Sequence, residues 1–169
     1  MCMTPSDRSQ EHETKASSPH TPYRRFVAMV LASALVMYVV MYFNTYQIDH
    51  VQFSWTRVYM TMMSSAAMAV IMWLFMRNMY QDRTKNTAVL VGSAVVFLTG
   101  LGLVRSQALV GDVAWMRAMI PHHSIAILTS ERAQLSDPRV RALADGIIET
   151  QKREIAEMNG LIRDLSSGN

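Results

Sequence analysis

Hydrophobic residues are concentrated in three uninterrupted runs, at residues 26–43, 58–76 and 87–104, none of which contains a charged residue. Each run is 18 or 19 residues long. An α-helix needs about 20 residues to cross the roughly 30 Å hydrocarbon core of a bilayer. Because lipid offers no hydrogen-bond partners to the backbone, we expect all three runs to be helices that span a membrane.

The polar segment before the first run, residues 1–25, is rich in Ser, Thr and Pro and is predicted to be a disordered tail. The first run itself is long for the core of a cleaved signal peptide, and no small-x-small cleavage site follows it. We therefore expect this run to stay in the protein as the first membrane helix.

Basic residues in the flanks predict the orientation of these helices. The tail carries four Lys or Arg residues, and the loop at residues 77–86 carries three, whereas the loop at residues 44–56 carries none. Basic flanks stay on the cytoplasmic side. The sequence thus predicts a bacterial cytoplasmic membrane protein with a cytoplasmic tail, and it places residues 105–169 in the periplasm.

The composition changes after residue 104: residues 105–169 hold eight basic and eight acidic residues. Ser136 or Asp137 can cap a helix that begins at Pro138, because proline suits the first helical position. The pattern predicts two helices, at about 108–133 and 138–166, that fold back on each other as a hairpin. We see no strand pattern, so the predicted fold class is all-α.

Heptad-like spacing predicts which faces of the hairpin meet. On the first helix the predicted contact face is Leu109, Asp112, Met116, Met119, His123, Ala126, Ser130 and Ala133. On the second helix it is Val140, Ala144, Ile147, Gln151, Glu154, Met158, Leu161 and Leu165.

Polar and sulfur-bearing residues stand at the same height on the two predicted faces. Folding the chain at residues 134–137 with equal rise per residue places Met119 near Gln151 and Met116 near Glu154. A buried carboxylate or imidazole is costly unless it is paired or bound. Both a metal site and a hydrogen bond between histidine and a carboxylate satisfy this requirement, and a polar network of that kind would fix the helix register.

Each predicted helix also carries a second apolar stripe with a period of seven residues. The stripes are Val113, Ile120 and Ile127 on the first helix and Ile148, Ile155 and Ile162 on the second. A hairpin of about 60 residues buries too little apolar surface to be stable alone. We therefore expect two hairpins to pair through these stripes in a homodimer. Packing against the membrane helices or another protein is the alternative.

Several function classes have no support in the sequence. The single cysteine, Cys2, excludes an intrachain disulfide and a cysteine-rich metal site. There is no basic patch typical of nucleic-acid binding, and no nucleophile motif, phosphate-binding loop or cofactor fingerprint, so we do not expect an enzyme. Asp49 and His50, in the loop at residues 44–56, are expected to be solvated.

The hairpin resembles the bacterial family called domain of unknown function 305. The resemblance is carried by DVAWMRAMIPHHSIAI from residue 112 and ETQKREIAEM from residue 149. It implies a ferritin-like fold in which helical hairpins assemble into four-helix bundles, and it implies copper binding or tolerance in the periplasm. Its signature positions here are Asp112, Met116, Met119, His122, His123, Gln151, Glu154 and Met158. This sequence departs from the family at Thr129, where many members have methionine, and at Gly160, where many have an aromatic residue.

Soft thioether and imidazole donors together suit copper(I) better than zinc, calcium or magnesium. The expected ligands are Met116, Met119, His122, His123 and Met158. Asp112, Gln151 and Glu154 are expected to support these ligands or to replace one of them. The sequence therefore predicts copper(I) as the bound metal, the bilayer and a second copy as partners, and a copper-handling protein as a further possible partner.

Overall fold

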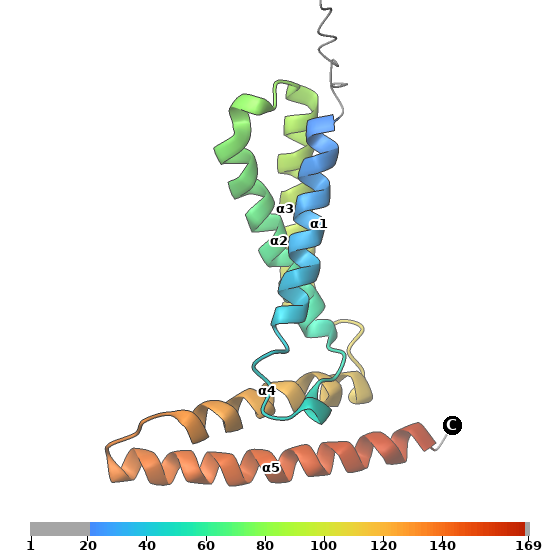
Figure 1. The fold of residues 1–169 in the computed structure, drawn as a ribbon. Helices are drawn as coiled ribbons and strands as arrows, with labels where there is room; N and C mark the ends of the chain where they lie inside the picture. Colours follow the sequence, from blue (N-terminus) through green and yellow to red (C-terminus); the bar gives the residue numbers. More distant parts are fainter. Residues whose placement is uncertain (1–20, 168–169) are drawn as a thin grey trace, which may run out of the picture.

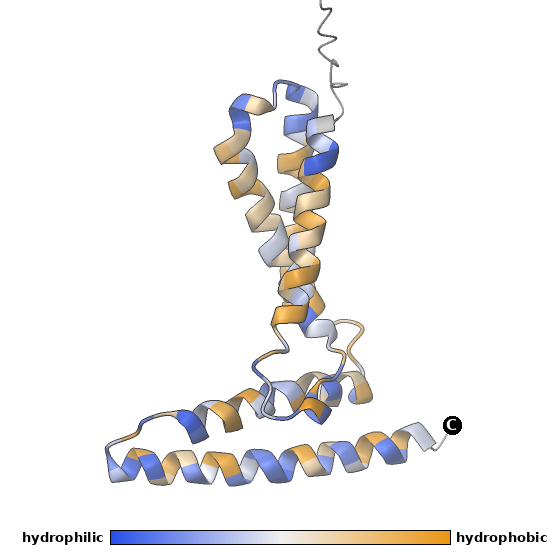
Figure 2. Cartoon of the chain, in the orientation of Figure 1, coloured by the Kyte–Doolittle hydropathy of each residue, from blue (hydrophilic) through white to orange (hydrophobic). Residues whose placement is uncertain are grey.

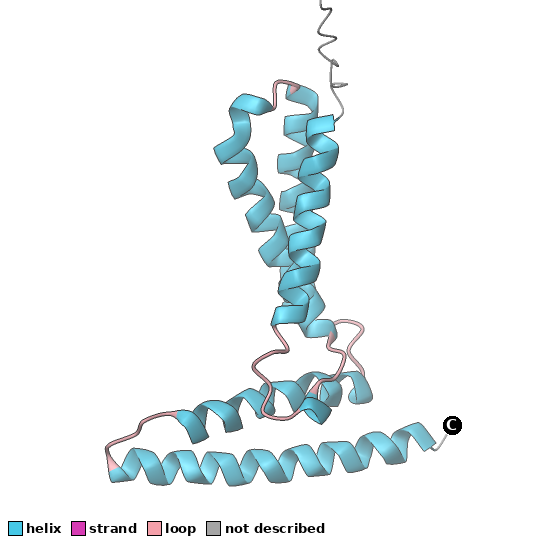
Figure 3. Cartoon of the chain, viewed as in Figure 1, coloured by secondary structure: helices cyan, strands magenta, loops and turns pink. Residues whose placement is uncertain are grey.

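The computed structural model describes residues 21–167, and all regular structure within that range is helical (Figure 3). The predicted all-α class is therefore confirmed. Three helices stand side by side, and two further helices lie across one end of them as an antiparallel pair (Figure 1). The elements in chain order are α1 Thr21–Val40, η1 Ile48–His50, α2 Trp55–Met76, η2 Arg77–Met79, α3 Arg83–Ser106, α4 Asp112–Arg132 and α5 Pro138–Ser167.

Three helical stretches are long and apolar enough to cross a membrane: Pro22–Val40, Trp55–Met79 and Arg83–Ser106. Figure 2 shows the predominance of apolar residues along α1, α2 and α3. The helices begin before the apolar runs, because a helix continues into the polar flanks where water can solvate it. Residues 21–25 of the predicted disordered tail are consequently helical. The rest of that tail lies outside the described residues.

α2 and α3 pack closely because α3 carries a glycine at the contact. A Cβ built on Gly100 would lie 2.9 Å from Met63 Cγ and 3.2 Å from the carbonyl oxygen of Tyr59. The missing side chain therefore lets the two backbones approach, as small residues do between membrane helices. α1 packs on α2, and the space that this leaves between α1 and α3 is a groove described below.

The predicted start of α5 is confirmed: the helix begins at Pro138. The Asp137 carboxylate accepts a hydrogen bond from the Arg139 backbone N–H at 2.8 Å and binds the Arg139 guanidinium at the same distance. These hydrogen bonds lower the pKa of Asp137. The carboxylate therefore caps the helix in its charged form.

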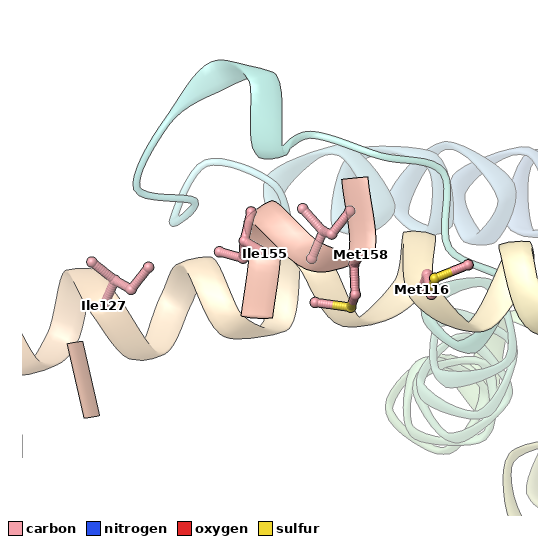
Figure 4. Packing of buried hydrophobic residues seen from close by; sticks show 5 residues of the cluster. Met116, Ile127, Ile155 and Met158 are labelled. Carbon is pink, nitrogen blue, oxygen red and sulfur yellow. The ribbon is translucent and has the colours of Figure 1, made fainter. Parts of the chain in front are cut away.

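The core of the hairpin is formed by five buried residues, four of which are labelled in Figure 4: Met116, Ile120, Ile127, Ile155 and Met158. Val113, Ile148 and Ile162 pack against this cluster. The isoleucine stripes thus lie inside one hairpin. The prediction that they would form the contact between two hairpins was wrong. Burying isoleucines removes more apolar area from water than burying a face that contains Asp112, His123 and Gln151.

Met116, Ala144 and Met158 of the predicted faces are buried, whereas other members of those faces are exposed. Leu161 is 46% exposed and Leu165 is 49% exposed, and Val140 and Ile147 also face outward. The relative position of the two helices differs too, because Glu154 lies beside His123 rather than beside Met116. The equal-rise count failed because residues 133–137 are not helical, and non-helical chain advances farther per residue than a helix.

Candidate functional site

His123 is the centre of the polar contact between α4 and α5. Its Nε2 lies 3.0 Å from Glu154 Oε2, and its Nδ1 lies 2.9 Å from the carbonyl oxygen of Met119. The His123 side chain is only 14% exposed, whereas that of Glu154 is 41% exposed. A partly buried imidazole is therefore held at both ring nitrogens, from one side by its own helix and from the other by α5.

The Met119 carbonyl fixes the tautomer of His123. A carbonyl oxygen only accepts hydrogen bonds, so Nδ1 must carry the hydrogen and donate it. Nε2 then faces Glu154, and a hydrogen bond between them requires a proton on either Nε2 or the carboxyl group. We expected Glu154 to support a metal-binding histidine; in the structure a backbone carbonyl holds one ring nitrogen of His123 and Glu154 faces the other. A backbone carbonyl is a common support for a metal-ligating histidine.

The three methionines predicted as ligands lie in or against the apolar core of the hairpin. Met116 is 4% exposed and Met158 is 7% exposed, and both belong to the buried apolar cluster (Figure 4). Met119 is half-buried and packs against the same cluster. All three thioethers are therefore in one hairpin core, and Met119 is also joined to His123 through its backbone carbonyl.

The remaining predicted positions surround this centre less closely. His122 is exposed, and its ring centroid lies 5.9 Å from that of His123. Gln151 is half-buried on α5, one turn before Glu154. Asp112 is exposed at the first residue of α4, about 16 Å along the helix from His123 at 1.5 Å per residue. The structure thus groups His123 with Glu154 and Met119, and it leaves Asp112 apart from them.

Within residues 21–167, no three histidine, cysteine, aspartate or glutamate side chains are placed to share a metal ion. Zinc and calcium sites are built from such groups. His123 and Glu154 thus offer one imidazole and one carboxylate, and the core of the same hairpin holds three thioethers. This donor set fits a soft monovalent ion better than a hard divalent one.

A second polar contact joins the first loop to α4, and sequence reasoning missed it. Ser124 is fully buried, and its Oγ accepts a hydrogen bond from the Tyr46 backbone N–H at 2.6 Å. His50 Nδ1 lies 2.9 Å from the same oxygen. His50 is only 7% exposed, so the expectation that it would be solvated was wrong, whereas Asp49 is exposed as expected. Neither residue's neighbours in sequence signal this long-range contact.

The same loop also reaches α5 and the far end of α4. The Tyr46 ring packs on the hairpin core, with Lys152 Nζ 5.7 Å from its centroid. The Tyr46 hydroxyl donates to Glu131 Oε1 at 3.4 Å, and this hydrogen bond raises the pKa of Tyr46. Gln52 Nε2 donates to Asn159 Oδ1 at 3.5 Å. The loop therefore contacts both helices of the hairpin. Its contacts with α4 include hydrogen bonds as well as the apolar packing of the Tyr46 ring.

Arg57 is a buried cation that directly follows the loop at residues 44–56, for which no basic residue was counted. It is 7% exposed, donates to the Met41 carbonyl, and lies 4.1 Å from the centroid of the Tyr42 ring. The carbonyl belongs to the turn that follows α1, so Arg57 satisfies an acceptor at a helix end. Its position two residues from Trp55 on one side and from Tyr59 on the other was the available signal for a structural arginine.

Comparison with known proteins confirms the predicted resemblance for the hairpin. Residues 112–168 match the model of the family described as "Domain of unknown function (DUF305)". An uncharacterised protein from Acanthamoeba polyphaga mimivirus is 28% identical over 142 residues, which cover 80% of this chain and 91% of that protein. This alignment is longer than the 57 residues from 112 to 168, so the similarity extends into the apolar helices. No solved structure matches the chain.

Proposed function

We propose that this chain is an integral membrane protein whose helical hairpin binds copper(I) at the membrane surface. The role would be copper binding, buffering or tolerance, with no catalytic step. The observation that carries the proposal is His123, which lies on the same helix as Met116 and Met119 of the hairpin core and whose Nδ1 is held by the Met119 carbonyl while Nε2 faces Glu154. A histidine with one nitrogen fixed by a carbonyl offers the other nitrogen to a metal.

Copper(I) suits this donor set for two reasons. It is soft, so it accepts thioether sulfur, and it carries one charge, so a single carboxylate beside it is sufficient. Met119 lies one helical turn before His123 on α4, and it packs against the buried cluster that contains Met116 and Met158. Binding would draw Nε2 away from Glu154 toward the sulfur atoms and would leave Glu154 as the neutralising neighbour.

Replacing Met116 and Met119 together with leucine tests this proposal. We expect copper(I) affinity to fall about ten-fold or more, because loss of metal-site groups has effects of this size. Helix content should be unchanged, because leucine preserves the apolar volume. A competition titration of the full-length protein with a copper(I) chelator measures the affinity. The matched control replaces Met29 and Met60, which are exposed on α1 and α2. Equal affinity in both double variants would contradict the proposal.

The rival function is a structural or partner-binding module in which the His123–Glu154 pair only fixes the helix register. The 3.0 Å contact favours it, because Nε2 is already engaged without a metal. Elemental analysis of gently purified protein separates the two functions. Copper at a fixed ratio to protein supports the first, and protein that takes up no copper(I) when it is supplied supports the second.

We also propose that the end of α1–α3 far from the hairpin is cytoplasmic, since Arg24, Arg25, Arg77, Arg83 and Lys85 are at that end. Arg57 and Arg105 are at the other end, so the asymmetry is five basic residues against two. Alkaline phosphatase fused after Asn169 should be active in a bacterial host, and the same enzyme fused at Gln81 should be inactive. The opposite pattern would place the hairpin in the cytoplasm.

Self-association remains a proposal, carried by different residues from those first expected. The exposed apolar residues of α5 recur along one flank of its contact with α4: Val140, Leu143, Ile147, Leu161 and Leu165. A second hairpin that covers them would complete a four-helix bundle. Mass measurement in mild detergent should then give a dimer, and replacing Leu143 and Leu161 with glutamine should give a monomer. A wild-type protein that is monomeric at every concentration would remove this proposal.

A further inference from the structure

The three apolar helices enclose a groove that no part of the described chain fills. It has a volume of about 760 Å³ and is lined by residues of α1, α2 and α3. Its lining includes Phe26 and Tyr38, which are separated by twelve residues of helix, or about 18 Å at 1.5 Å per residue. One leaflet of a bilayer contributes about half of the roughly 30 Å hydrocarbon core. The groove is therefore about as long as one leaflet is thick.

Lys85 is the charged residue in the groove lining, and it stands at the end far from the hairpin. Its Nζ lies 3.0 Å from Asp82 Oδ2, and its side chain is 33% exposed. Arg24, Arg25 and Arg83 are exposed near the same end, and they form no salt bridge with another residue in the range 21–167. One end of an apolar groove thus carries a net positive charge.

We propose that this groove binds one acyl chain of an anionic phospholipid, with the phosphate group at Lys85. The apolar walls match the chain, the length matches one leaflet, and the basic end matches the head group. Basic pockets between membrane helices on the cytoplasmic side are typical sites for anionic head groups, and each basic residue near the surface contributes to the attraction. The groove volume also lies within the range of small-molecule sites.

A membrane helix from a second copy is the competing occupant. Ser65 lines the groove, and its hydroxyl oxygen is buried without a hydrogen-bond partner among the described residues. A neighbouring helix would use this hydroxyl, whereas an acyl chain would not. The charge at Lys85 favours the lipid, because none of the spans offers an acidic residue that would lie opposite it.

Native mass spectrometry of the full-length protein in mild detergent tests the proposal, with phosphatidylglycerol and phosphatidylcholine of identical acyl chains as probes. Phosphatidylglycerol should be retained preferentially. Gly92→Leu should abolish this retention, since Gly92 lines the groove and a Cβ there meets nothing within 4 Å. Gly102→Leu is the matched control, because Gly102 is also on α3 with open space but does not line the groove.

Lys85→Gln should lower phosphatidylglycerol retention about five-fold, the effect of one basic residue near the membrane surface. Arg105→Gln, at the other end of α3, should have no effect. Equal retention of the two lipids would overturn the proposal, as would equal behaviour of the two glycine variants. A dimer that dissociates in both Ser65→Ala and Gly92→Leu would also overturn it, because the groove would then hold a second copy.

Discussion

Replacing Ile155 with alanine is expected to destabilise the hairpin by about 2–5 kcal/mol, the usual range for truncating a buried isoleucine. Ile155 is 5% exposed and lies in the cluster with Ile120 and Ile127, both of which are fully buried. Hydrogen exchange of α4 and α5 in the full-length protein measures the loss of stability.

Leu161→Ala is the control for this prediction, because Leu161 lies on the same helix but is 46% exposed. Its effect on hydrogen exchange of the monomer should stay within about 0.5 kcal/mol, as for other surface substitutions. The two variants separate the observed packing from the heptad-like face first expected, which placed Leu161 inside and Ile155 outside. A larger loss in Leu161→Ala than in Ile155→Ala would contradict the observed register.

Replacing Ser124 with alanine is expected to release the first loop from α4. The change leaves the Tyr46 backbone N–H and His50 Nδ1 without their shared partner, and an unsatisfied buried group costs about 1–3 kcal/mol. The loop should therefore separate from the hairpin more often. Faster hydrogen exchange at Tyr46 and faster modification of His50 by diethylpyrocarbonate are the expected results.

Thr129→Ala is the matched control for the loop, because the Thr129 hydroxyl bonds only to carbonyls of its own helix, at Ile125 and Ala126. It should leave the exchange at Tyr46 and the reactivity of His50 unchanged. If Ser124→Ala behaves like this control, the loop is held by the Tyr46 ring and not by the buried hydroxyl.

The hairpin is supported by two contacts with the rest of the chain, one from the loop that carries Tyr46 and one from α2. A hairpin of this size was expected to need a second hairpin to bury enough apolar surface. The structure instead supplies a loop whose Tyr46 ring packs on the core, and α2 contacts α4 directly. Packing against the membrane helices was the alternative to pairing with a second hairpin. The dimer that we propose would therefore add to this packing and would not be needed to form the core.

The sequence by itself determined the elements and their kinds. Three charge-free runs predicted three helices long enough for a membrane, because length and apolarity are local properties. The Asp137–Pro138 pair predicted where α5 begins, because capping also depends only on neighbours. The string from Met116 to His123 predicted the family resemblance of residues 112–168.

Only the tertiary structure decided which helix faces meet and which residues share a site. The contact between α4 and α5 spans two adjacent stripes, because Glu154 meets His123 while Ile155 lies in the buried cluster, and periodicity did not predict that both would contribute. His50 and Ser124 are 74 residues apart in sequence, and no local pattern links them. The pairing of His123 with Glu154 and the burial of His50 depend on packing between distant segments, which sequence periodicity does not encode.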